Sequence, residues 1–239
     1  MWSFLVCVHL TIMQEIILLH GALGAAEQLN PIKEKLANQF VVFSFNFEGH
    51  GGQPITRPYS IENFAENLSN FIRENNIQQP NIFGYSMGGY VALYHAYTYP
   101  NQLNKIITLG TKFNWTKASA ESEIKFLDAE KIEAKVPAFA KSLSELHGAE
   151  NWKSVLKHTT ELMLNLGDAP SLLDKHYVSI TNKCYLCLGE QDQMVTETET
   201  KHVANLIPSA NLYLLPNTPH PIDKINVNLV VQKIQDILS

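Results

Sequence analysis

The sequence predicts an α/β fold: a mostly parallel, doubly wound sheet with helices on both faces and an inserted helical segment. Short apolar runs typical of buried strands alternate with longer runs whose apolar residues recur at helical spacing. Repeated β–α units of this kind form parallel sheets covered by helices. The alternation breaks once, between residues 112 and 178, where only helices are predicted. A chain of 239 residues can form one such sheet-centred domain.

Apolar runs bounded by turn residues predict strands over 15–19, 40–45, 81–84, 105–110, 183–189 and 211–215. Helices are expected over 25–39, from Ser60 onwards, over 91–97, over 196–207 and from about residue 222. Ser60 stands where an N-cap belongs, ahead of a run with one apolar face. The core is therefore expected to comprise residues 1–111 and 179–239, with residues 112–178 inserted as a helical unit.

Composition and charge exclude several classes of partner. Apolar residues make up 45% of the chain and charged residues 17%, which is typical of a globular protein. The net charge of −5 gives no basic excess to attract nucleic acid or anionic lipid, so we expect neither as a partner. The only arginines are Arg57 and Arg73, so recognition of a multiply anionic substrate would depend on lysines.

The cysteines predict no metal or disulfide site. Cys184 and Cys187 lie three residues apart in a predicted strand, and such positions point to opposite faces of a sheet. We therefore expect two separate buried thiols, which fits a reducing, cytoplasmic environment.

The first residues, MWSFLVCVHLTI, are apolar but lack a basic n-region and are too short to span a membrane. We interpret them as an extra edge strand or as a tail upstream of a start at Met13. A cleaved signal peptide is the third alternative.

The stretch GYSMG places Ser86 between Gly84 and Gly88, with a predicted strand before it and a predicted helix after it. A G-x-S-x-G sequence in this context is typical of a sharp strand-to-helix turn that exposes a nucleophilic serine. The carboxyl edge of a doubly wound sheet, where Ser86 would lie, is where such folds bind ligands. The sequence therefore predicts that Ser86 is a nucleophile. The alternative is a glycine-rich turn with an incidental serine.

A serine nucleophile needs a base, and the base needs an orienting acid. Asp192 follows one predicted strand and His220 follows the next, so both are expected at the same sheet edge as Ser86. Glu190 and Asp223 are the alternative acids, and Asp223 is expected in the first turn of the last helix. The other histidines are interpreted as structural, in helices (His95, His147, His158, His202) or in loops near the site (His20, His50).

Two backbone N–H groups are needed to stabilise the oxyanion of an acyl-transfer reaction. Met87 directly follows the nucleophile and is expected to supply one of them. The loop HGALG after the first strand is expected to supply the other, from Ala22 or, as the second choice, from Leu23.

These motifs together resemble the α/β-hydrolase family from Met13 onwards: LLHGALG at the oxyanion loop, GYSMGG at the nucleophile, GEQDQMV at the acid and PHP at the histidine. The resemblance implies the α/β-hydrolase fold, no metal or other cofactor, and a helical cap over 112–178 inserted after the sixth strand of the family's sheet. Leu23, Tyr85 and Trp115 are candidates for contacting the substrate. In the inserted segment the apolar residues Trp115, Phe126, Trp152 and Leu162 either face the substrate or pack the segment on the core, and packing is favoured for most of them.

The function that follows is a carboxylesterase-like serine hydrolase acting on a small or medium uncharged ester, thioester or lactone. The chain also resembles the menaquinone-pathway lyase that eliminates pyruvate, which shares the GYS motif. That enzyme has an arginine-lined cleft, whereas this chain has Tyr90 past the serine and no arginine after Arg73. A C–C lyase is therefore the first alternative. A non-catalytic small-molecule receptor on the same scaffold is the second, and no oligomeric state is predicted.

Overall fold

The structure is a computed structural model that describes residues 13–239. The interpretations of the N-terminal apolar run concern residues 1–12 and lie outside the described residues.

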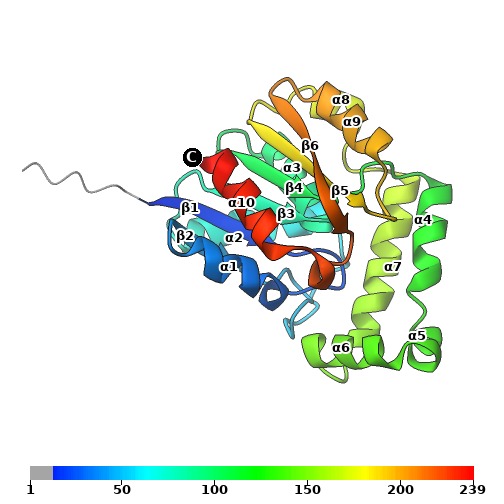
Figure 1. Cartoon of the computed structure of the whole chain (residues 1–239). Helices are drawn as coiled ribbons and strands as arrows, with labels where there is room; N and C mark the ends of the chain where they lie inside the picture. Colours follow the sequence, from blue (N-terminus) through cyan, green and yellow to red (C-terminus); the bar gives the residue numbers. More distant parts are fainter. Residues whose placement is uncertain (1–12) are drawn as a thin grey trace, which may run out of the picture.

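Six parallel strands form one sheet in the order β2-β1-β3-β4-β5-β6 (Figure 1). Their bounds are Gln14–Leu19 for β1, Phe40–Ser44 for β2, Asn81–Tyr85 for β3, Ile106–Leu109 for β4, Cys184–Gln191 for β5 and Ala210–Pro219 for β6. Each neighbouring pair runs in parallel, for example Ile16 opposite Asn81. The six predicted strands are confirmed, with differences of a few residues at their ends.

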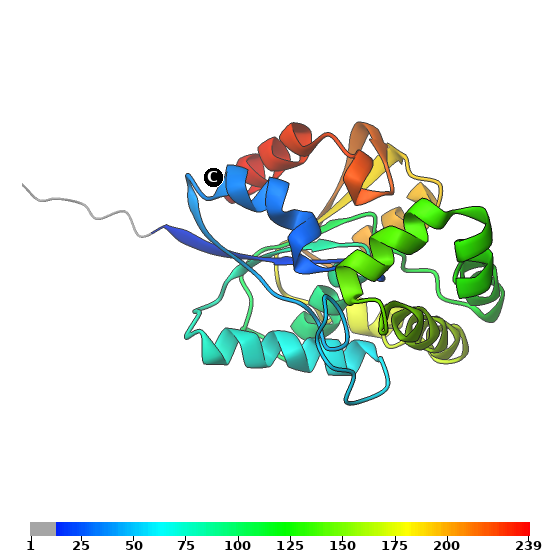
Figure 2. The ribbon, with the colours of Figure 1, turned by 90° about the horizontal axis from the view of Figure 1, so that it is seen from below.

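Helices cover both faces of this sheet (Figures 1 and 2). On one face, α1 (Asn30–Leu36) and α10 (Val227–Leu238) pack over a cluster of buried strand residues that includes Ile16 and Cys187. On the other face, α2 (Ile61–Glu74), α3 (Met87–Thr98) and α9 (Glu197–Leu206) pack over a second cluster that includes Ile17 and Cys184. Because strand side chains alternate between faces, Cys184 and Cys187 are separate buried thiols, as predicted, and burial raises the pKa of each to about 12.

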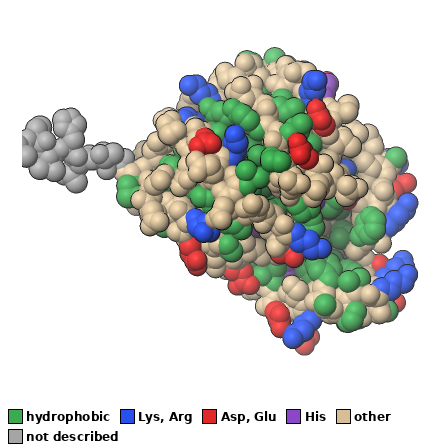
Figure 3. Space-filling view, in the orientation of Figure 1, with side chains coloured by type: hydrophobic (Ala, Val, Ile, Leu, Met, Phe, Trp, Pro, Cys, Tyr) green, Lys and Arg blue, Asp and Glu red, His purple; other side chains and the backbone are tan. Residues whose placement is uncertain are grey.

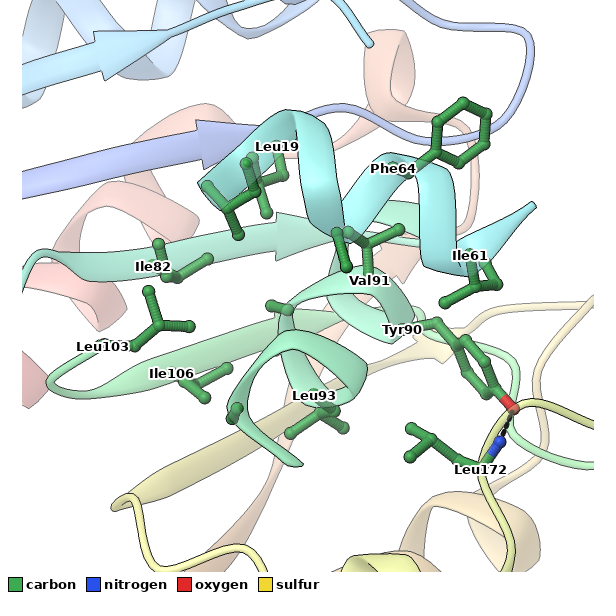
Figure 4. Packing of buried hydrophobic residues seen from close by; sticks show 14 of the residues in the cluster. Leu19, Ile61, Phe64, Ile82, Tyr90, Val91, Leu93, Leu103, Ile106 and Leu172 are labelled. Carbon is green, nitrogen blue, oxygen red and sulfur yellow. Dashed lines mark hydrogen bonds between the residues drawn. The ribbon is translucent and has the colours of Figure 1, made fainter. Parts of the chain in front are cut away.

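The second cluster fixes α3 against the strands. Leu19, Ile82 and Ile106 from three neighbouring strands meet the α3 side chains Val91 and Leu93 (Figure 4). All five are fully buried, so each contributes about 1.5–3 kcal/mol of hydrophobic stabilisation. This packing holds the N-terminus of α3, which carries Ser86, at the carboxyl edge of β3.

The predicted N-cap of α2 is confirmed. The Ser60 hydroxyl accepts a hydrogen bond from Asn63 N at 3.0 Å, which satisfies one of the free N–H groups of the first turn.

Two helices differ from prediction. The segment 25–39 divides into a 3-10 helix, η1 (Ala26–Leu29), and the shorter α1. The last helix begins at Val227 rather than near 222, because Ile225 is extended and Asn226 Oδ1 caps the helix by accepting from Leu229 N. Asp223 therefore lies in the preceding 3-10 helix, η3 (Ile222–Lys224), and not in the first turn of α10.

Between β4 and β5 the described chain contains only helices and connecting loops. They are α4 (Lys117–Glu123), η2 (Ile124–Phe126), α5 (Ala129–Lys135), α6 (Pro137–His147), α7 (Trp152–Asp168) and α8 (Asp174–Tyr177). We call α4 to α7 the helical segment. It extends from one end of the sheet and has a small core of its own around Trp152 and Leu156 (Figure 1). In Figure 3, hydrophobic side chains gather in the recess where this segment meets the body of the protein.

Across residues 13–239, no helix combines the length and the apolar character that crossing a membrane would require.

Candidate active site

Ser86 lies at the turn between β3 and α3, in a conformation that L-residues rarely adopt. Its φ is +51° and its ψ −117°. Such a backbone costs on the order of 1–3 kcal/mol and persists only where its surroundings impose it. Here Ser86 N donates to Leu109 O at 2.8 Å, and Thr111 Oγ1 donates to Ser86 O at 3.0 Å. Both partners belong to β4 and the loop after it, so the neighbouring strand fixes the strained turn.

Close backbone contacts explain two glycines of the turn. A Cβ on Gly84 would lie 2.5 Å from Gly89 N, and one on Gly88 would lie 2.5 Å from Leu19 O. Any side chain at these positions would therefore separate α3 from β3 and from the end of β1. Ser86 thus lies close to the loop that follows β1.

Asp192 and His220 form a buried hydrogen-bonded pair at the same sheet edge. Asp192 directly follows β5 and His220 directly follows β6. His220 Nδ1 lies 2.8 Å from Asp192 Oδ2, and the two side chains are 9% and 2% exposed. Asp192 Oδ1 accepts from Met194 N and Val195 N at 2.8 and 2.9 Å. Because both carboxylate oxygens have partners, Asp192 is held in the orientation that bonds the imidazole.

The alternative acids lie elsewhere. Glu190 and Asp223 are exposed, and within the described part of the chain neither forms a hydrogen bond or ion pair with His220.

Ser86 and His220 line one pocket, whose empty volume, open solvent included, is about 520 Å³. Most of its other lining residues are apolar: Ala22, Ile61, Met87, Tyr90, Trp115, Leu162, Met163, Leu166, Met194 and Val195. The Tyr90 hydroxyl accepts from Leu172 N at 3.0 Å, which fixes this ring against the wall (Figure 4). Over residues 13–239 no hydrogen bond joins the side chains of Ser86 and His220. Such a bond is often long in ligand-free enzymes and tightens when substrate binds.

Two expected N–H donors border this pocket. Met87 is the first residue of α3, where N–H groups have no partner within the helix. Ala22 lies in the loop after β1, and both residues line the pocket beside Ser86. The helix N-terminus also directs a positive partial charge toward this point.

Leu23 and Tyr85 do not line the pocket. Leu23 has a φ of +56°, and its side chain packs between the main core and the core of the helical segment. Tyr85 points to the face of the sheet that α1 and α10 cover, because strand side chains alternate. Its hydroxyl donates to His220 O at 2.9 Å, and burial raises its pKa. Tyr85 therefore supports the backbone of His220 rather than the pocket.

The aromatic residues of the inserted region differ in position. Trp115 lines the pocket, as expected, whereas Trp152 is buried in the core of the helical segment and Phe126 is 74% exposed.

One feature of the pocket has no counterpart in the sequence-based predictions. Lys112 Nζ and Glu123 Oε1 form an ion pair at 3.0 Å, with side chains only 17% and 14% exposed, and both residues line the pocket. Lys112 Nζ also donates to Met194 O at 3.4 Å. Lys112 lies in a loop and Glu123 in α4, eleven positions later. The sequence contains no pattern that distinguishes these two residues from ordinary surface charges.

Within residues 13–239 the other histidines lie outside this pocket. His20, His50 and His147 form a buried group behind the loop after β1, with ring centroids 5.0 Å apart for His20–His50 and 5.9 Å apart for His50–His147. Burial lowers the pKa of all three, for His20 to about 4. His95 is buried in α3, His158 bonds Ser154 O within α7, and His202 is exposed beside Asp174.

The described residues contain no group of three or more histidine, cysteine, aspartate and glutamate side chains arranged to hold a metal ion.

Comparison with known proteins agrees with this architecture. A family model described as the alpha/beta hydrolase fold matches residues 15–129. Proline iminopeptidase PfmaB of Pestalotiopsis fici is 25% identical to this chain over an alignment 260 positions long, which covers 94% of this chain and 91% of that protein.

Two solved structures align over nearly the whole chain. The putative lipase lip1 from Acinetobacter baumannii AYE has a TM-score of 0.80 at 20% identity, and the alignment covers 95% of this chain and 83% of that one. MenH from S. aureus has a TM-score of 0.75 at 21% identity, over 94% and 93% of the two chains. At these identities the two structures define the fold alone. With the family model, the relative and the parallel sheet in agreement, the chain has the α/β-hydrolase fold.

Proposed function

We propose that this chain is a serine hydrolase that cleaves a small or medium carboxylic ester, thioester or lactone through an acyl-enzyme on Ser86. One observation carries the proposal: the 2.8 Å bond between Asp192 Oδ2 and His220 Nδ1, formed at the pocket that Ser86 lines. This bond favours the imidazole tautomer with its proton on Nδ1 and leaves Nε2 free to accept a proton.

In the proposed reaction, Ser86 Oγ attacks the carbonyl carbon while its proton passes to His220 Nε2. The N–H groups of Met87 and Ala22 stabilise the negative charge that develops on the carbonyl oxygen. His220 then gives the proton to the departing alcohol, thiol or ring oxygen as the bond to the carbonyl carbon breaks. Water, deprotonated by His220, releases the acid and restores Ser86.

The pocket favours an uncharged substrate. Its lining is apolar except for Ser86, His220 and the Lys112–Glu123 pair, whose charges neutralise each other. An additional anionic group would have to compete with Glu123 for the ammonium of Lys112. We propose that the helical segment acts as a cap that limits the size of the substrate.

A C–C lyase of the menaquinone-pathway type is the second candidate, and the structural likeness to MenH from S. aureus favours it. The lining of the pocket argues against the lyase, because none of the lining residues described within 13–239 is an arginine. Arginine forks bind carboxylates in two-point geometry that a single lysine does not reproduce.

The test is hydrolysis of a p-nitrophenyl ester series by the wild type and by Ser86→Ala. Ester cleavage that Ser86→Ala abolishes, with the variant still folded, supports the serine hydrolase. Absence of ester cleavage by the folded wild type contradicts it. Two further assays then separate the alternatives: pyruvate release identifies the lyase, and cleavage of an N-terminal proline amide tests the activity named for the Pestalotiopsis relative.

A further inference from the structure

Trp115 separates two pockets. One is the pocket that Ser86 and His220 line. The other lies beyond the loop 113–115 and has an empty volume, open solvent included, of about 1190 Å³. Within the described residues, Trp115 is the one residue that lines both. Trp115 therefore lies at the boundary of the two pockets.

Other segments also pass from one pocket to the next. Val195 borders the first pocket and Thr196 the second. Leu166 borders the first, and Pro170 and Leu172, a few residues further on, border the second. Three separate stretches of chain therefore carry residues of the first pocket next to residues of the second, and Trp115 is the residue common to both.

The second pocket has an apolar side and a polar side, the latter formed by Asn114, Asp174, Thr196, Thr198, Glu199 and His202. Phe113, Leu172, Tyr177 and Val203 are buried apolar side chains of its lining. The carboxylate of Glu199 is already engaged, since Oε2 accepts from Phe113 N and Asn114 N and Oε1 accepts from Thr196 N. An apolar ligand would therefore not be opposed by an unpaired buried charge.

The ring of Trp115 lies beside the Lys112–Glu123 ion pair. Its ring is partly buried against the main core, and Lys112 Nζ lies 5.9 Å from the ring centroid. The same ammonium pairs with Glu123, so the ion pair and the indole form one unit at the boundary.

We propose that Trp115 sets the chain length of the substrate and that the pocket behind it is a latent alkyl subsite continuous with the site of Ser86. The substrate-length part of this proposal rests on the proposed ester hydrolysis. The subsite itself concerns binding alone. In the wild type the indole blocks the end of the alkyl chain of a bound acid. In Trp115→Ala this alkyl chain extends into the second pocket.

The experiment measures binding of dodecanoate and butanoate by calorimetry to the wild type, Trp115→Ala and Trp115→Ala/Thr198→Trp. Each methylene transferred from water to an apolar groove is worth about fourfold in affinity. Trp115→Ala should therefore raise the ratio of the dodecanoate affinity to the butanoate affinity by at least about tenfold over that of the wild type. Thr198 is exposed and lines only the second pocket, so the added indole in the double variant should block that space and abolish the gain.

Phe126→Ala is the matched control, since it removes an exposed aromatic residue of the same helical segment and should leave both affinities unchanged. An unchanged preference between the two acids in Trp115→Ala overturns the proposal. So does a gain that persists when Thr198→Trp is added. The kcat/KM ratio for p-nitrophenyl dodecanoate over butanoate should rise in parallel if the chain is an esterase. A shift in binding without ester cleavage would instead contradict the proposed activity and leave the subsite supported.

Discussion

His147 Nε2 lies 3.0 Å from the carbonyl oxygen of Leu23, so a side chain of the helical segment bonds the loop that carries Ala22. His147 Nδ1 accepts from Gly51 N at 3.0 Å, which leaves the ring proton on Nε2 as the donor to Leu23. The ring is 1% exposed, and burial lowers its pKa, so it remains neutral at pH 7. His147 thereby joins three segments that are distant in the sequence and positions the proposed oxyanion loop.

The first prediction concerns this link. His147→Leu removes both bonds at similar volume and should lower kcat on an ester by about tenfold or more, with KM changed little, because the Ala22 N–H loses its fixed direction. His147→Gln keeps one donor and one acceptor and should restore part of the rate. Steady-state kinetics beside thermal unfolding give the answer. Destabilisation of both variants with an unaltered kcat would assign His147 a structural role only.

The second prediction tests the orienting acid. In Asp192→Asn the side-chain oxygen should keep the bonds from Met194 N and Val195 N, which turns the NH₂ group toward His220 Nδ1. The imidazole must then carry its proton on Nε2 and can no longer accept one from Ser86. We expect kcat to fall by about 10³–10⁴.

Glu190→Gln and Asp223→Asn are the controls for Asp192, because both carboxylates are exposed. Each should retain nearly full activity. A loss in either control as large as that in Asp192→Asn would move the role of the acid to that residue.

The third prediction concerns charge selection in the pocket. Glu123→Gln frees the ammonium of Lys112 from its carboxylate partner at 3.0 Å. We compare an ester whose acyl chain ends in a carboxylate with one whose acyl chain ends in a methyl group. The ratio of kcat/KM for the first ester to that for the second should rise by about tenfold in the variant, because charge-assisted hydrogen bonds are worth about 1.5–3 kcal/mol. Competition assays between the two esters measure that ratio. No shift would mean that the Lys112 ammonium does not reach the substrate.

Lys131→Met is the control for this experiment. It removes a lysine from an exposed ion pair of the same helical segment and should leave the ratio unchanged.

Local patterns were sufficient to predict the sheet and the strand ends at which Ser86, Asp192 and His220 stand. Each of these residues directly follows a strand, and the carboxyl ends of parallel strands meet at one edge. The chain order of strands and loops therefore determined which side chains would meet. The position of Tyr85 was also available from the sequence, because side chains two apart on a strand share a face and Tyr85 therefore lies on the face of Phe83.

Contacts that involve the helical segment were not predictable in this way. The Lys112–Glu123 pair and the bond from His147 to Leu23 depend on how α4 and α6 pack against the loops of the sheet. Helical spacing gives the apolar face of each helix but not its angle or its partner. The position of Trp115 at the boundary of the two pockets likewise depends on the path of the loop between β4 and α4.

The last prediction concerns His95, whose ring is fully buried in α3 and whose two nitrogens have no hydrogen-bond partner among the described residues. An unpaired buried polar group costs about 1–3 kcal/mol, so His95→Leu should raise the free energy of unfolding at pH 7 by an amount of this order.

The gain from His95→Leu should grow as the pH falls. Burial lowers the pKa of His95 from its ordinary 6.5 to about 4, so between these values the unfolded chain binds a proton that the folded protein does not. The free energy of unfolding of the wild type therefore decreases as the pH falls below 6.5, and at pH 5 it is lower by about 2 kcal/mol. Urea unfolding at pH 7 and pH 5 should show the difference between variant and wild type widening by about this amount. His202→Gln, at an exposed position, should behave as the wild type at both pH values. A constant difference between His95→Leu and the wild type would mean that the ring of His95 gains its proton in the folded protein as readily as in the unfolded chain.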